Sequence, residues 1–173
     1  MNTTIPILGF AAPSGTGKTT LMEQVITELT RDGFKVGAIK HGHHPADPDV
    51  PGKDTHRFRQ AGARTVLFAC PQRWFMIQEL DPEPEPDLNQ QVQLFYGHDL
   101  ILVEGYKNDS HPKIGIYRRG VTQLDSLTAL THMVAIATDD WTLETTYPLL
   151  PLYEPGLVAH FIVKHLGLLQ EGA

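Results

Sequence analysis

The chain of 173 residues is short of cysteine and of positive charge, and both shortages exclude classes of protein. Cys70 is its single cysteine, so neither an intrachain disulfide nor a cysteine-based zinc site can form. Lys and Arg total 14 against 20 Asp and Glu, a formal net charge of -6. With a sequence pI near 5.8, this balance argues against a protein that coats nucleic acid or binds membranes through a polybasic patch.

Long apolar runs are also absent. No stretch approaches the roughly 18 apolar residues of a membrane span, and the N-terminus lacks the pattern of a signal peptide. We therefore expect neither feature, and a reducing cytoplasmic location. The length fits a single nucleotide-binding domain over residues 1–173.

Short apolar runs that alternate with helical patterns predict the fold. Residues 65–70 and 73–78 form either a hairpin or consecutive strands across Pro71 and Gln72, and residues 79–87 form an acidic, proline-rich loop. The pattern predicts an α/β fold with a mostly parallel sheet flanked by helices, plus an antiparallel strand extension. The other expected strands are 5–10, 34–40, 100–103, 113–117 and 133–138, and the expected helices are 19–31, 54–61, 88–96 and 155–166.

Helix ends and faces can also be predicted. Glycine just past a helix adopts the left-handed cap at low cost, so Gly33 and Gly62 are expected to end the helices before them. Asp54 is expected to cap the start of its helix. In the last helix, Leu157, Phe161 and Ile162 are expected to face inward.

The strongest chemical signal is a glycine-rich segment between the first strand and the first helix. It reads Ala12-Pro13-Ser14-Gly15-Thr16-Gly17-Lys18-Thr19, which departs from the phosphate-loop pattern only in Ala12, where glycine is usual. Backbone amides of such a loop and the start of its helix bind phosphate oxygens. Lys18 reaches the β and γ phosphates, and the Thr19 hydroxyl ligates Mg²⁺.

Two carboxylates and one lysine could complete this site. Glu104 ends a buried apolar strand, where phosphate-loop proteins place an acid that holds Mg²⁺ or its water. Asp54 either caps its helix or faces the metal opposite Thr19, and Lys53 either neutralises phosphate charge or is simply solvated. Asp139, after the late strand 133–138, either accepts hydrogen bonds from guanine or stabilises a turn, so the residues alone leave the base undecided.

Three histidines, His41, His43 and His44, follow the second strand. They suggest a transition-metal site, but hydrogen bonding near the phosphates or packing of the loop accounts for them better. We also expect Lys18 and Lys40 to cluster around the phosphates with Lys53, Arg57 and Arg59.

Several sequence blocks together resemble the molybdopterin-guanine dinucleotide biosynthesis protein B family. The resemblance covers about residues 5–140 and the C-terminal helix. Its blocks are Ile39-Lys40-His41-x-His43-His44, Asp49-Val50-Pro51-Gly52-Lys53-Asp54, Arg57-Phe58-Arg59-Gln60-Ala61-Gly62-Ala63 and Leu102-Val103-Glu104-Gly105-Tyr106-Lys107.

The resemblance implies a GTP-binding adapter with weak Mg²⁺-dependent hydrolysis, at most a slow GTPase. It implies assistance to the guanylyltransferase that joins GMP to molybdopterin, and a homodimer built through the strands at 65–78, with molybdopterin itself as a further candidate ligand. Two other functions stay open, namely a small-molecule kinase or ATP-dependent synthetase, and a metal-delivery GTPase. The expected nucleotide-binding residues are Ser14, Gly15, Thr16, Gly17, Lys18, Thr19, Thr20, Lys53 and Asp139, and the expected Mg²⁺ ligands are Thr19, Glu104 and Asp54.

Overall fold

The computed structural model describes residues 5–42, 44 and 46–169. Contacts divide the chain into two compact units. The sheet unit comprises residues 1–42 and 88–173, and the hairpin unit comprises residues 43–87. The expectation of one domain over residues 1–173 stays a prediction.

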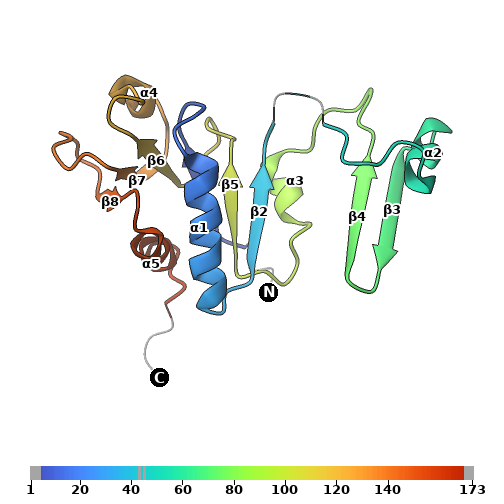
Figure 1. Ribbon diagram of the computed structural model, residues 1–173, viewed down its shortest axis with the longest axis horizontal. Coiled ribbons are helices and arrows are strands. Elements are labelled where there is room, and N and C mark those ends of the chain that lie inside the picture. The colour runs from blue at the N-terminus through green and yellow to red at the C-terminus, as the bar shows by residue number, and fades with distance from the viewer. Residues whose placement is uncertain (1–4, 43, 45, 170–173) are drawn as a thin grey trace. The chain divides into compact units, whose positions relative to one another are not determined.

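The described part of the sheet unit is built on six parallel strands in the order β2-β5-β1-β6-β7-β8 (Figure 1). Helices connect and cover these strands, so the predicted α/β class with a mostly parallel sheet flanked by helices is confirmed. The strands are β1 Ile7–Ala11, β2 Val36–Lys40, β5 Leu100–Glu104, β6 Lys113–Tyr117, β7 Met133–Thr138 and β8 Leu149–Pro151, and the helices are α1 Lys18–Arg31, α3 Leu88–Val92, α4 Leu124–Thr128 and α5 Pro155–His165.

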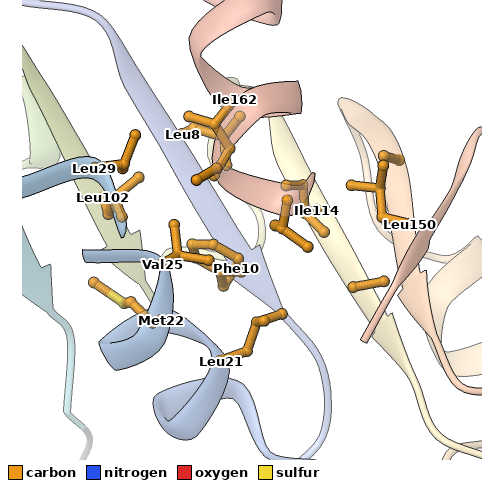
Figure 2. Packing of buried hydrophobic residues seen from close by; sticks show 14 of the residues in the cluster. Leu8, Phe10, Leu21, Met22, Val25, Leu29, Leu102, Ile114, Leu150 and Ile162 are labelled. Atoms are coloured by element: carbon orange, nitrogen blue, oxygen red, sulfur yellow. The ribbon is translucent and has the colours of Figure 1, made fainter. Parts of the chain in front are cut away.

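The largest core cluster lies between the sheet and helices α1 and α5. Leu21, Val25 and Leu29 recur along one face of α1 and are at most 2% exposed, as their helical spacing predicts. Figure 2 shows them packed against strand residues such as Phe10 of β1. Burying each such side chain stabilises the fold by roughly 1.5–3 kcal/mol.

Two smaller clusters contain the residues that α3 and α4 bury. Leu88 and Val92 of α3 pack with Ile101 and Val103 of β5. Leu127 of α4 forms the other cluster with Met133 and Ile136 of β7. The side chains of β5 point alternately into the α3 cluster on one face of the sheet and into the largest cluster, beside α1, on the other. Helices therefore cover both faces of the sheet.

The hairpin unit contains helix α2 Asp54–Gln60 and the antiparallel strands β3 Thr65–Cys70 and β4 Arg73–Gln78. The hairpin alternative for this segment is therefore correct. The side chain of Arg59 is 9% exposed, and its guanidinium pairs with Asp47 at 2.7 Å, Asp49 at 3.2 Å and Glu79 at 2.7 Å. This network joins α2 to the segments before it and after β4.

Several local expectations are wrong. The N-cap residue of α2 is Lys53, without a side-chain capping bond, and Asp54 is the first helical residue, where its charge complements the positive helix end. Helix α3 ends at Val92 rather than at residue 96. Leu157 is 53% exposed because the inward face of α5 is formed by Val158, Ala159, Ile162 and Val163.

Among residues 5–42, 44 and 46–169, no helix is both long and apolar enough to span a membrane.

Candidate functional site

The loop from Ala12 to Gly17 connects β1 to α1 through two left-handed positions. Gly15 has φ +77° and Gly17, the N-cap of α1, has φ +94°, conformations that cost glycine little. The Thr16 hydroxyl, buried at 1% exposure, donates to the Pro13 carbonyl at 2.9 Å. Thr16 thus fixes the loop, and the first amides of α1 stay available at a helix end that favours anions.

Lys18 extends back over this loop. Its Nζ donates a hydrogen bond to the Pro13 carbonyl at 2.8 Å. Burial lowers the pKa of Lys18 below its ordinary value, with a further lowering by Lys40 and an opposing effect of the Glu104 carboxylate. The ammonium group therefore lies beside the loop backbone that is expected to bind phosphate.

Thr19 and Glu104 meet although 85 residues separate them. The Thr19 Oγ1 donates to Glu104 Oε2 at 2.9 Å, and Lys40 Nζ lies 3.4 Å from Glu104 Oε1. The strand register explains the meeting, because Glu104 pairs with Phe10 of β1 on one side and with Lys40 of β2 on the other. A hydroxyl beside a carboxylate offers the hard oxygen ligands that Mg²⁺ prefers.

These groups line a cavity of about 480 Å³ at the carboxyl edge of the sheet. Its charged side chains are three cations, Lys18, Lys40 and Arg118, and one acid, Glu104. The excess of positive charge suits an anionic ligand. The remaining lining residues are Ser14, Gly15, Gly17, Thr19 and Thr20.

Arg118 was missed by the reasoning from sequence. It directly follows β6, which pairs with β1 on the side opposite β5. A signal was present, since residues just after a parallel strand reach the carboxyl edge of the sheet.

Asp139 directly follows β7, and its carboxylate already has two partners. Oδ1 accepts from the Arg119 backbone amide at 2.8 Å, and Oδ2 accepts from the Tyr153 hydroxyl at 3.4 Å. A carboxylate offers about four acceptor positions, so contact with a base remains chemically open and stays a prediction. Hydrogen bonds from Thr142 lower the pKa of the adjacent Asp140.

Lys53, Asp54, Arg57 and Arg59 belong to the hairpin unit. Asp54 pairs with Arg57 at 3.7 Å, with both side chains exposed. Arg59 is held by three acids of its own unit, which offset its positive charge. The ligand roles of Lys53 and Asp54, and the expected place of these cations near the phosphates, stay predictions.

Of the three predicted histidines, His41 has a defined packing role. Its ring stacks on Tyr106 with centroids 4.4 Å apart, and a Cβ at Gly105 would lie 2.7 Å from the His41 Cβ. His43 lies outside the described residues, and His44 is exposed. Within residues 5–42, 44 and 46–169, no group of three or more His, Cys, Asp or Glu side chains could hold a metal ion.

Comparisons with known proteins agree with one another. Residues 7–139 match the family Molybdopterin guanine dinucleotide synthesis protein B. The molybdopterin-guanine dinucleotide biosynthesis adapter protein of Escherichia coli (strain K12) is 43% identical over 140 residues, 79% of this chain and 80% of that protein. The adapter protein of the same description from Haemophilus influenzae is 37% identical over 168 residues, 96% of this chain and 92% of that protein.

A solved structure is similar over nearly its full length. The crystal structure of Bacillus subtilis MobB superposes with a TM-score of 0.74 at 24% identity, covering 93% of this chain and 98% of that one. At that identity the similarity shows the fold.

Proposed function

Because this chain belongs to the molybdopterin guanine dinucleotide synthesis protein B family, we propose that it is an adapter that binds GTP with Mg²⁺ during synthesis of that dinucleotide. The observation that carries the nucleotide proposal is the 2.9 Å contact between Thr19 and Glu104 beside the phosphate loop. In phosphate-loop proteins such a hydroxyl and acid hold the Mg²⁺ that accompanies the β and γ phosphates.

Different residues of the cavity bind the phosphates and the metal ion. Backbone amides around Gly15, Gly17 and Lys18 donate to phosphate oxygens, and the Lys18 ammonium leaves the Pro13 carbonyl to contact them. Thr19 and Glu104 hold Mg²⁺, which when bound neutralises phosphate charge. Because no glutamine lines the described cavity to orient a water molecule, we expect hydrolysis to be slow.

Nucleotide binding is tested by thermal unfolding with Mg-GTP and with Mg-ATP. At a ligand concentration 100-fold above Kd, binding stabilises the folded state by about 2.7 kcal/mol. Lys18→Ala should remove most of that shift, whereas Lys35→Ala, an exposed lysine outside the cavity, should retain it. Glu104→Gln should reduce the part of the shift that depends on Mg²⁺.

Binding measurements also distinguish the proposed GTP-binding adapter from the alternative functions. Equal shifts in the Lys18 and Lys35 variants would refute the assignment of the site. A strict preference for ATP, with ATP-dependent product formation, would favour a kinase or synthetase. Stoichiometric nickel or zinc binding, lost when His41, His43 and His44 become alanine, would favour a metal-delivery GTPase.

The partner within this proposal is the guanylyltransferase that joins GMP to molybdopterin. Co-elution of the two proteins with and without GTP tests it directly. Association in at least one condition is the expected result. Failure to associate in both conditions would contradict the adapter role, and a separate measurement would show whether molybdopterin binds to this chain itself.

The homodimer is proposed to form through the hairpin of β3 and β4. Leu67 is 58% exposed, Trp74 is 62% exposed, and Met76, the cross-strand partner of Leu67, is 41% exposed. Exposed apolar side chains that lie together in this way mark interaction surfaces. A two-stranded sheet has two unpaired edges and is marginally stable alone. Trp74→Asp should therefore shift the mass in solution towards the monomer, whereas Tyr96→Asp, at a side chain 96% exposed in the sheet unit, should not.

A further inference from the structure

Two cations of the phosphate cavity, Lys40 and Arg118, lie outside the phosphate-loop motif. Lys40 was expected near the phosphates from the sequence, and Arg118 was not. Strand β6 brings Arg118 there. Gly115 of β6 pairs with Ala11, the last residue of β1, so β6 continues for two further residues past the end of its neighbour. Arg118 is the next residue along the chain and lies beside the loop that begins at Ala12.

The backbone of Arg118 is fixed on both sides. Its amide donates to the Thr122 hydroxyl at 3.0 Å, and its carbonyl accepts from the Thr122 amide at 2.9 Å. Thr122 is 7% exposed, so the turn that carries Arg118 is anchored in the protein. Because this backbone is already ordered, binding a ligand costs the rotamer entropy of the Arg118 side chain but no further backbone entropy.

The side chain of Arg118, in contrast, has no hydrogen bond or ion pair with any described residue. Other arginines do have such partners. Arg119 lies 3.8 Å from the Asp140 carboxylate, and Arg59 binds three acids. Glu104, the one acid among the described residues that line the cavity, is already in contact with Thr19 and Lys40. The positive charge of Arg118 is therefore left for the ligand.

We infer that Arg118 contacts the polyphosphate chain of the bound nucleotide, as a third cation beside Lys18 and Lys40. This inference rests on the proposed nucleotide binding. A guanidinium binds phosphate through two parallel hydrogen bonds, so it fixes the orientation of a phosphate as well as adding charge.

The test compares wild type with Arg118→Ala, Arg118→Lys and the matched control Arg119→Ala. Arg119 is the adjacent arginine, 75% exposed on its side chain, and it does not line the cavity. Isothermal titration with Mg-GTP measures Kd, and competition with tripolyphosphate measures phosphate binding without a base. Arg118→Ala should weaken both about tenfold, Arg118→Lys less, and Arg119→Ala less than about twofold.

The results separate this inference from the proposed function. If wild type binds Mg-GTP and Lys18→Ala does not, but Arg118→Ala binds like Arg119→Ala, the inference is overturned and the proposed function stands. Loss of GTP affinity with unchanged tripolyphosphate affinity would also overturn it, because Arg118 would then act on base or ribose. If wild type does not bind Mg-GTP, both the inference about Arg118 and the proposed nucleotide binding are wrong. An unchanged melting temperature of Arg118→Ala without nucleotide shows that the loss is not unfolding.

Discussion

A buried histidine in the sheet unit leads to the sharpest prediction about stability. His111 is 6% exposed, and neither ring nitrogen has a hydrogen-bond partner among the described residues. Burial, followed by the charge of Lys113, lowers the pKa of His111 from 6.5 to about 4, with Asp109 opposing and His132 adding to the shift. The native ring thus stays neutral at a pH where an unfolded chain takes up a proton.

The sign and size of the effect follow from this difference in pKa. Between pH 6.5 and pH 4 the unfolded state binds more protons, so stability is full above pH 6.5 and falls as the pH decreases. At about 1.4 kcal/mol for each unit of pKa, the whole loss is about 3.4 kcal/mol, of which about 2 kcal/mol has occurred by pH 5.

Urea denaturation at pH 7.5 and at pH 5.0 measures this loss. His111→Leu, which replaces the ring by an apolar side chain, should lose about 2 kcal/mol less than wild type between the two pH values. His160→Leu, at an exposed histidine of α5, should behave like wild type. Equal losses in wild type and His111→Leu, or a His111 ring that titrates near pH 6.5 by NMR, would refute the reasoning.

Three further predictions concern close packing and buried charge. Gly9→Ala should destabilise by about 1–3 kcal/mol in urea denaturation, because the new Cβ would lie 2.5 Å from the His111 Nε2; an unchanged midpoint would contradict this. Arg59→Met leaves the Asp49 carboxylate, 3% exposed, without its cation. It should therefore accelerate amide exchange in the hairpin unit about tenfold or more. Equal protection of the amides in the variant and in wild type would contradict this. Lys113→Met should raise the pKa of His111 in an NMR titration, because the Lys113 charge lowers that pKa; an unmoved value would exclude this coupling.

Strands bounded by turn residues could be predicted almost residue by residue. The bounds of β3 and β4 are as expected, because an apolar run ends on each side of Pro71 and Gln72. The choice between a hairpin and consecutive strands needed the structure. The elements α4 and β8 were not predicted, since five and three residues carry too little periodicity.

The faces of helices were less predictable where apolar residues are abundant. Helix α1 has one apolar stripe, and its inward residues follow from their spacing. In α5, Leu157 adjoins Val158, and hydrophobicity alone does not decide between them. Tertiary packing does: Val158 is 0% exposed and Leu157 is 53% exposed.

The buried pair His111 and Lys113 could not be found from sequence. The Lys113 side chain is fully buried, and its Nζ donates to the carbonyls of His111 and Asp109. This arrangement depends on a loop that runs from β5 to β6 and brings His111 against Gly9 of β1. The one local sign was Gly9 itself, because glycine within an apolar strand often marks a close approach of another segment.

The candidate site was predictable to the extent that its residues depend on strand direction. In a parallel sheet the carboxyl ends of the strands lie at one edge, so Lys40, Glu104 and the phosphate loop could be expected together before the strand order was known. Their contacts depend on register, in which Phe10, Lys40 and Glu104 are paired across three strands. Arg118, directly after an expected strand, could also be placed at this edge. Its reach into the cavity, however, depends on the extension of β6 beyond β1, an offset that no local pattern encodes. The motif therefore predicts the phosphate loop at the centre of the site, and the register of the sheet determines that Arg118 lines the same cavity.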